Sequence, residues 1–293
     1  MNASAEFLDR ALAVALRAAD AAAAIIRERY RTHDFTVAIK DDQTPVTEAD
    51  RDAEIVIRRT LAGSFADHAF YGEEQGRDGD SEFLWLIDPI DGTKAFVRGY
   101  PFFSTQIALL HGGELVLGVS NASEYGERAW AMRGGGAFLN GQPLRVSGAE
   151  EFGPRTAIST GNLKSLAAGP RWNALAGLIG RVGRIRGYGD FLHYHLLARG
   201  AIDLVIESDV NILDIAALCV IVREAGGVFT DLDGAAPGLA TTSALAGTPA
   251  LHAQALALFA LDRSDAPRDR PHASRDRPDA SRDRPDALRD RPL

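Results

Sequence analysis

The sequence of 293 residues contains a single cysteine, Cys219, so no disulfide bond can form within the chain. Cys219 lies in an apolar helical pattern, where we expect a small core residue rather than a nucleophile. No apolar run is long enough to span a membrane, and the first residues lack the basic segment of a signal peptide. We therefore expect a cytoplasmic protein that has no contact with membranes.

The sequence also lacks an excess of positive charge, because its formal net charge is −8. Nucleic-acid-binding proteins usually carry basic patches with interleaved aromatic residues, and no segment shows that pattern. We therefore expect no nucleic-acid partner. An acidic protein that handles phosphate needs positive charge from another source, and a bound metal ion is the simplest one.

The stretch at residues 83–98 is the most informative part of the sequence. Its apolar run 83–87 predicts a strand that is buried on both faces and ends at Asp88. Pro89 stiffens the following turn, and Gly92 lets the backbone bend so that Asp88 and Asp91 approach one point. Two adjacent carboxylates repel each other, and a hard divalent cation such as Mg²⁺ would relieve this repulsion.

The backbone N–H groups of residues 92–94, at the start of a turn or short helix, suit a bound phosphate. The alternative is that Asp88, Asp91 and their neighbours form only a polar turn, since Asp, Pro and Gly are common turn residues. Three acidic residues elsewhere in the chain bear on this choice.

Glu73 follows a predicted strand at 69–71, and the next strand delivers Asp88 and Asp91. If these strands are neighbours in one sheet, Glu73 lies near both aspartates; otherwise Glu73 and Glu74 form an ordinary solvated loop.

Asp50 and Asp214 each fall in the first turn of a predicted helix. Thr47 is the expected N-cap of the first helix. The second helix, from 211 to a glycine C-cap at 226, is apolar nearly all round and hence buried. Either acid could simply complement the helix dipole, while a metal ion is the more specific interpretation of a carboxylate at a buried helix.

The remaining pattern predicts an α/β (α+β) protein of two lobes. A helix at 4–31 and an antiparallel meander at 103–141 belong to the first lobe, and alternating strands and helices from 156 onward belong to the second. We expect an N-terminal α+β lobe, a C-terminal α/β lobe and a disordered Arg-Asp-Arg-Pro repeat tail, at residues 1–150, 151–263 and 264–293.

In order and spacing, three motifs resemble the inositol monophosphatase family: Gly72-Glu73-Glu74, Trp85-Leu86-Ile87-Asp88-Pro89-Ile90-Asp91-Gly92-Thr93, and Asp214-Ile215-Ala216-Ala217 followed by Glu224-Ala225-Gly226-Gly227. The resemblance covers roughly residues 11–261. It implies a layered α/β/α/β/α sandwich, usually dimeric, that hydrolyses phosphate monoesters with two or three Mg²⁺ ions and is inhibited by Li⁺. Loss of catalysis in a scaffold or phosphate-binding regulator is the alternative, and the retained acids argue against it.

The same resemblance implies roles for individual residues. The metal ligands would be Glu73, Asp88, Asp91, Asp214 and the Ile90 carbonyl. Thr93 with Glu73 would orient the attacking water, and Asp50 would support a further metal ion through water. The amides of Gly92 and Thr93 would hold the phosphate, and Glu207 would contact the substrate. These groups would support direct attack by a metal-activated water, since the Asp88-x-x-Asp91 spacing does not match phospho-aspartate enzymes.

Within the family, the chain is most similar to the histidinol-phosphatase branch, through residues 91–99, 188–192 and 222–227. Ala95 and Leu213 depart from the residues common there, an Asn and a Trp. Asp190 and Glu207 suit a cationic leaving group, although Asp190 could merely cap its helix. The resemblance implies hydrolysis of L-histidinol phosphate in histidine biosynthesis, with an inositol-1-monophosphatase or a broad sugar-phosphate phosphatase as the alternative. For His193 and His195, beside Asp190, we expect packing or surface roles.

Overall fold

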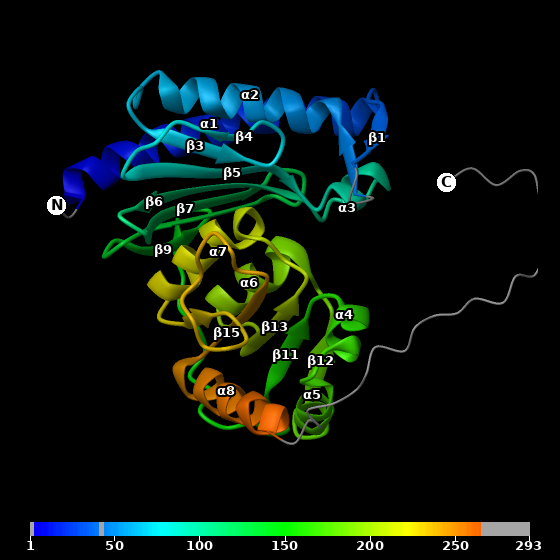
Figure 1. The fold of residues 1–293 in the computed structure, drawn as a ribbon. Helices are drawn as coiled ribbons and strands as arrows, with labels where there is room; N and C mark the ends of the chain where they lie inside the picture. The colour runs from blue at the N-terminus through cyan, green and yellow to red at the C-terminus, as the bar shows by residue number, and fades with distance from the viewer. Residues whose placement is uncertain (1–2, 41–43, 265–293) are drawn as a thin grey trace, which may run out of the picture.

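The computed structural model describes residues 3–40 and 44–264 as five stacked layers (Figure 1). Helices α1 (Ala5–Thr32) and α2 (Glu48–Ala62) cover one face of an eight-stranded sheet. Helices α6 (Asp190–Ala198) and α7 (Ile212–Glu224) lie between this sheet and a five-stranded one. The outer face of the second sheet is covered by α4 (Leu163–Ala168), α5 (Trp172–Ile179) and α8 (Pro249–Ser264). The α/β/α/β/α sandwich expected from the sequence is confirmed.

The larger sheet carries the acidic stretch on β5, an interior strand that is third from one edge. Its strands run in the order β10 (Gln142–Pro143), β9 (Gly136–Leu139), β8 (Glu127–Met132), β7 (Glu114–Ala122), β6 (Ser104–His111), β5 (Phe83–Asp91), β3 (Ala69–Gly72) and β4 (Gly76–Asp78). Only β3 and β5 pair in parallel; the other neighbours are antiparallel, as the predicted meander requires. A separate hairpin of β1 (Val37–Ile39) and β2 (Pro45–Thr47) precedes α2, and the short helix α3 (Thr93–Val97) follows β5.

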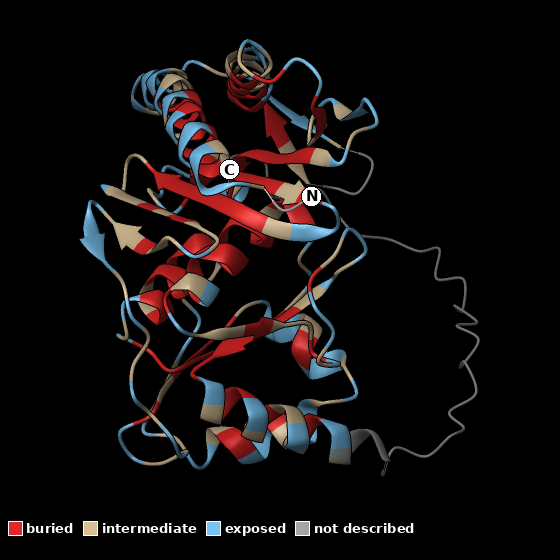
Figure 2. Ribbon diagram, turned by 90° about the vertical axis from the view of Figure 1, so that its left-hand side faces the viewer, coloured by how far each residue is buried: buried red, intermediate tan, exposed pale blue. Residues whose placement is uncertain are grey.

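The smaller sheet has the order β12 (Arg184–Arg186), β11 (Ala157–Thr160), β13 (Leu204–Ser208), β15 (Ser243–Gly247) and β14 (Val228–Thr230). Helix α7 is buried from residue 212 to 222 apart from Asp214, and packs against both sheets. Figure 2 shows most of this central helical layer coloured as buried. The two halves of the chain therefore share one core, and the lobe division at residue 150 stays a prediction.

Three details differ from the sequence-based expectations. Strand β5 does not end at Asp88 but runs to Asp91, because its pairing with β6 resumes beyond Pro89. The C-cap of α7 is Ala225 rather than a glycine, and Gly226 follows it with the left-handed φ of 87°. Helix α4 and strands β2, β4 and β14 were not predicted. None of the described helices is long and apolar enough to cross a lipid bilayer, and the predicted tail, apart from Ser264, lies outside the described residues.

Candidate active site

A bulge in β5 brings Asp88 and Asp91 to the same side of the sheet. Asp88 pairs with Gln106 of β6, and Asp91 with Ser104, so three steps along β5 match two along β6. In a regular strand, residues three apart point to opposite faces, and one extra residue restores the same face. Pro89 lies within this irregularity, where a missing backbone N–H is tolerated. The sequence suggested convergence through a turn; the structure achieves it through a bulge.

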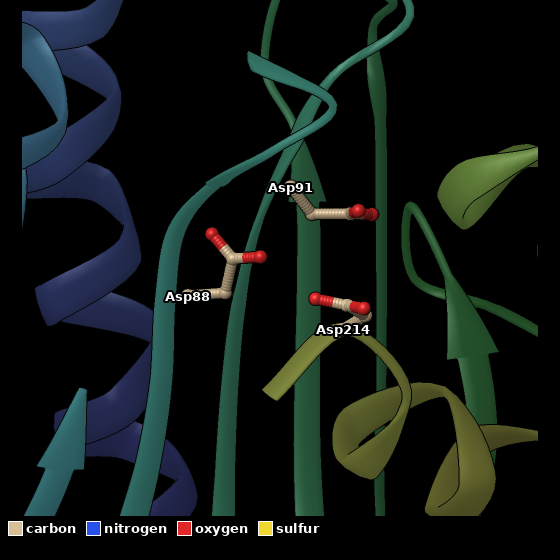
Figure 3. Close-up of side chains that lie close together, drawn as sticks. All are labelled: Asp88, Asp91 and Asp214. Carbon is tan, nitrogen blue, oxygen red and sulfur yellow. The ribbon is translucent and has the colours of Figure 1, made fainter. Parts of the chain in front are cut away.

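Asp214 completes a group of three carboxylates. One oxygen each of Asp88, Asp91 and Asp214 lie within 4.8 Å of one another, and Figure 3 shows the three side chains gathered at the end of β5 and the start of α7. Asp214 also accepts the backbone N–H of Asn211, the N-cap of α7, at 2.8 Å. The acid therefore belongs to a capping box as well as to the cluster, and its interpretation as a metal ligand stays a prediction.

Glu73 lies beside this cluster. Gly72 pairs in parallel with Ile87, so the next residue along each strand, Glu73 and Asp88, are neighbours. Lys40, just after β1, contacts Glu73 through its Nζ at 2.9 Å and Glu74 at 2.6 Å. This cationic partner of Glu73 was missed, because a lysine in a loop carries no distinguishing sequence signal.

The carboxylates of the cluster repel one another. Burial raises the pKa of Asp88 and Asp91 well above the ordinary value, and neighbouring acids raise both further. Burial also raises the pKa of Asp214 to about 7, against the lowering effect of its hydrogen bonds from Asn211. Hard divalent cations prefer such oxygen donors and would offset the repulsion. The donor set therefore fits a metal ion.

Thr93 links the cluster to α2. Its Oγ1 lies 3.2 Å from Oδ1 of Asp50 and 2.9 Å from the Ile90 carbonyl oxygen. Thr47 is the N-cap of α2, as predicted, and its N–H and hydroxyl both donate to Asp50. Burial nonetheless raises the pKa of Asp50 to about 6, although these hydrogen bonds lower it. Asp50 thus both caps its helix and contacts Thr93.

Gly92 occupies a position that only glycine suits. Its φ is 91°, and a Cβ there would lie 2.7 Å from the Phe102 carbonyl oxygen. Gly92 is the N-cap of α3, and the first N–H groups of a helix have no acceptor within the helix. Gly92, Thr93 and Lys94 line the same pocket as the acidic cluster.

The pocket over the cluster has a volume of about 480 Å³ and is lined by the predicted residues Glu73, Asp88, Ile90, Asp91, Gly92, Thr93, Asp190 and Asp214. Lys94 and Arg98 add positive charge to its wall. A hollow between α1 and α2 is larger, about 560 Å³, but its Arg29 pairs with Asp34 and Asp52, and none of the predicted site residues lines it.

A cavity of about 80 Å³ adjoins the cluster and is lined by Asp91, Asp190, Glu207, Asp209 and Asp214, with apolar residues behind them. Asp190 is the first residue of α6 and not its cap, since Gly189 occupies that position. Burial and the charge of Glu207 raise the pKa of Asp190 to about 6. Asp190 and Glu207 thus lie together at the cavity, as the predicted substrate role requires.

The two histidines of α6 have different surroundings. His195 is fully buried between Ser120 of β7 and Glu127 of β8, so it has the expected packing role. His193 is also fully buried, but its Nε2 lies 3.0 Å from Oε2 of Glu207. The contact between His193 and Glu207 was missed, because the two residues are 14 positions apart and come together only when α6 packs against β13.

Comparison with known proteins gives a consistent result. Residues 8–263 match the model of the inositol monophosphatase family. The histidinol-phosphatase of Mycobacterium tuberculosis is 41% identical over 252 residues, which are 84% of this chain and 96% of the relative. An inositol-1-monophosphatase of Mesorhizobium japonicum is 34% identical over 77% of this chain and 86% of its own length.

Solved structures show the same arrangement of elements. The crystal structure of the extragenic suppressor protein suhB from Bartonella henselae superposes with a TM-score of 0.77 at 31% sequence identity. The match covers 84% of this chain and 96% of that one. The similarity therefore extends over both sheets and their helices.

Proposed function

Because the chain belongs to the inositol monophosphatase family and is a phosphoric monoester hydrolase, we propose that its substrate is L-histidinol phosphate. Water would cleave the ester to L-histidinol and inorganic phosphate, a step of histidine biosynthesis. The observation that carries the proposal is the cluster of Asp88, Asp91 and Asp214 beside a second group of acids at the cavity.

The family is metal-dependent, and we propose that Asp88, Asp91, Asp214, Glu73 and the Ile90 carbonyl hold two or three Mg²⁺ ions. Such ions, when bound, would make a water more acidic and neutralise charge on the phosphoryl oxygens. We expect Li⁺ to inhibit by competing for this oxygen site.

The chain's own groups would position the reactants. Thr93, whose hydroxyl lies between Asp50 and the Ile90 carbonyl, would orient the attacking water with Glu73 alongside. The N–H groups of Gly92 and Thr93 would hold phosphoryl oxygens. This arrangement supports direct in-line displacement at phosphorus without a covalent enzyme intermediate, because Cys219 is buried and does not line the pocket, and because the aspartates are assigned to metal binding.

The acids of the cavity favour a cationic leaving group. L-Histidinol carries an ammonium and an imidazole, and charge-assisted hydrogen bonds to Asp190 and Glu207 would hold it. Inositol offers only hydroxyl groups, for which this concentration of negative charge is not needed. The relatives include both enzyme types, so an inositol 1-phosphate or sugar-phosphate specificity is the second candidate.

Steady-state kinetics with L-histidinol phosphate and inositol 1-phosphate separates these candidates. We expect kcat/KM to favour L-histidinol phosphate by at least about a hundredfold, which corresponds to two charge-assisted contacts. Asp190→Asn should reduce that preference. A preference of the unaltered protein for inositol 1-phosphate would reject the proposed substrate.

Asp88→Asn tests the metal site itself. Loss of one ligand charge should lower metal-dependent phosphate release by at least about a hundredfold, and isothermal titration should show weaker Mg²⁺ binding. Asp80→Asn, at a fully exposed acid on the loop before β5, is the control and should change neither quantity. Unchanged phosphate release in Asp88→Asn would remove these carboxylates from the mechanism.

We also propose that the protein acts in the cytoplasm as a homodimer. The proposed step of amino-acid biosynthesis supports this compartment, and the family resemblance implies the dimer. Size-exclusion chromatography with light scattering would measure the mass, and a monomer of 31.4 kDa at working concentration would contradict the dimer.

A further inference from the structure

Glu207 is held by two side chains of one helix. The hydroxyl of Tyr194 donates to Oε2 of Glu207 at 2.7 Å, and Nε2 of His193 lies 3.0 Å from the same oxygen. Because a carboxylate oxygen only accepts hydrogen bonds, Nε2 carries the hydrogen. Both donors are almost completely buried, at 0% exposure for His193 and 1% for Tyr194.

His193 is itself fixed from behind. Its Nδ1 lies 3.3 Å from Oγ of Ser159, which is fully buried on β11. Ser159 accepts the backbone N–H of Tyr188 at 3.2 Å, so its hydroxyl has a defined partner on each side. The ring cannot rotate away without leaving buried polar atoms unpaired, which costs free energy.

The opposite side of Glu207 is closed by backbone. A Cβ at Gly161, which follows β11, would lie 2.5 Å from both Cγ and Oε1 of Glu207. The N–H of Gly161 donates to the Ile206 carbonyl at 3.1 Å, so this backbone cannot easily retreat. Glu207 therefore occupies a narrow slot between Gly161 and α6.

From this geometry we propose that His193 and Tyr194 are positioning residues that hold Glu207 at the cavity as the recognition group for the leaving alcohol. The inference deepens the proposed function and depends on it for the choice of a cationic alcohol. Helix α6 then contributes in two ways, since it also carries Asp190 to the same cavity. A carboxylate with one fixed orientation loses little entropy on binding, and this favours a specific alcohol over others.

Four variants test the proposal, three on α6 and one at Gly161, which follows β11. Tyr194→Phe removes one hydroxyl and keeps the ring. His193→Leu removes the second donor, whereas His193→Gln keeps an N–H donor near the position of Nε2. Gly161→Ala approaches Glu207 from the opposite side without removing any donor. Each is assayed with L-histidinol phosphate, inositol 1-phosphate and 4-nitrophenyl phosphate, whose aromatic leaving group needs no acidic partner.

We expect Tyr194→Phe and His193→Leu to raise KM for L-histidinol phosphate by about tenfold, the effect of one hydrogen bond to a charged group. Gly161→Ala should also raise this KM, because the added Cβ would displace the Glu207 carboxylate. The inhibition constant of the product L-histidinol should rise by a similar factor. Values for 4-nitrophenyl phosphate should stay within about twofold, and His193→Gln should recover most of the loss. Thermal melting of each variant reports its folding separately.

Equal losses on all three substrates, or no loss on any, would overturn the positioning role. The proposed substrate fails by a different result, namely inositol 1-phosphate being the better substrate of the unaltered protein. In that case the positioning role still predicts that KM for inositol 1-phosphate rises in the variants while KM for 4-nitrophenyl phosphate does not.

Discussion

The backbone N–H of Glu74 donates to Oε2 of Glu54 at 2.7 Å. Glu54 is completely buried on α2, one turn after Asp50, and its other oxygen accepts from Nε of Arg58 at 2.8 Å. Nη2 of Arg58 reaches the Gly76 carbonyl oxygen. Helix α2 thus holds the loop that carries Glu73 through the Glu54 carboxylate, and Glu54 does not itself line the pocket over the acidic cluster.

Glu54→Ala should lower the free energy of unfolding by about 3 kcal/mol, because it leaves the Arg58 charge and two loop N–H groups without their partner. Urea denaturation of the metal-free protein measures this. The matched control is Asp52→Ala on the same helix, whose pairing with Arg29 is partly exposed and contributes less than about 1 kcal/mol. If both substitutions lowered the free energy of unfolding equally, the proposed role of Glu54 in holding this loop would be contradicted.

In the metal-free protein, Asp214 and Asp50 should contribute stability that is lost as pH rises from about 4 to above 7. An unfolded aspartate has a pKa near 3.9, whereas burial raises the pKa of Asp214 to about 7 and that of Asp50 to about 6 in the folded protein. The folded state therefore binds more protons in this range, and its advantage is complete below pH 4 and lost above the folded pKa values.

Thermal melts with a chelator at pH 5 and pH 8 would measure this slope. Excess Mg²⁺ should raise the melting temperature at pH 8 far more than at pH 5, because protons compete for the same oxygens. If Asp214→Asn left the difference in stability between pH 5 and pH 8 unchanged in the chelated protein, the assignment of repelling carboxylates would be contradicted.

Gly92→Ala should destabilise the protein and impair phosphate release, because the new Cβ would meet the Phe102 carbonyl oxygen. Gly113→Ala is a matched control, since φ there is 87°, close to the 91° of Gly92, but the added Cβ would meet nothing within 4 Å. Both substitutions carry the cost of positive φ, about 1 kcal/mol. A larger loss of melting temperature in Gly92→Ala than in Gly113→Ala measures the steric part.

Ending the chain after Arg263 should leave folding and activity unchanged. The repeated prolines and paired charges of the tail offer no apolar seam, so we expect no contribution to the core. The values of kcat/KM and melting temperature should match those of the full chain within about twofold and about 2 °C respectively. A marked fall in kcat/KM or in melting temperature would show that the tail contributes to activity or folding.

The pattern of apolar residues predicted α1, α2, β5 and α7 as individual elements, whereas the layered arrangement was implied by the family resemblance. The sequence also identified the carboxylates that converge, since Asp88, Asp91 and Asp214 lie in motifs at strand and helix ends. The bulge was not foreseeable, because it depends on the register between β5 and β6 rather than on either strand alone.

Contacts between distant segments were also beyond the sequence. Lys40 reaches Glu73, and His193 reaches Glu207, across gaps of 33 and 14 residues. Neither spacing corresponds to the period of a helix or a strand, so the periodicity of the sequence cannot predict these contacts. The assigned roles of the pocket residues stay predictions until the substitutions above are measured.

Helix α7 has one further consequence. Its first turn carries Asp214 to the acids of β5, while its body is packed between the two sheets. An ion bound by these residues would link β5 to α7. Release of the ion would then be coupled to the packing of α7 between the two sheets. A cavity-creating substitution in α7, far from the pocket, should therefore increase the dissociation rate of the ion.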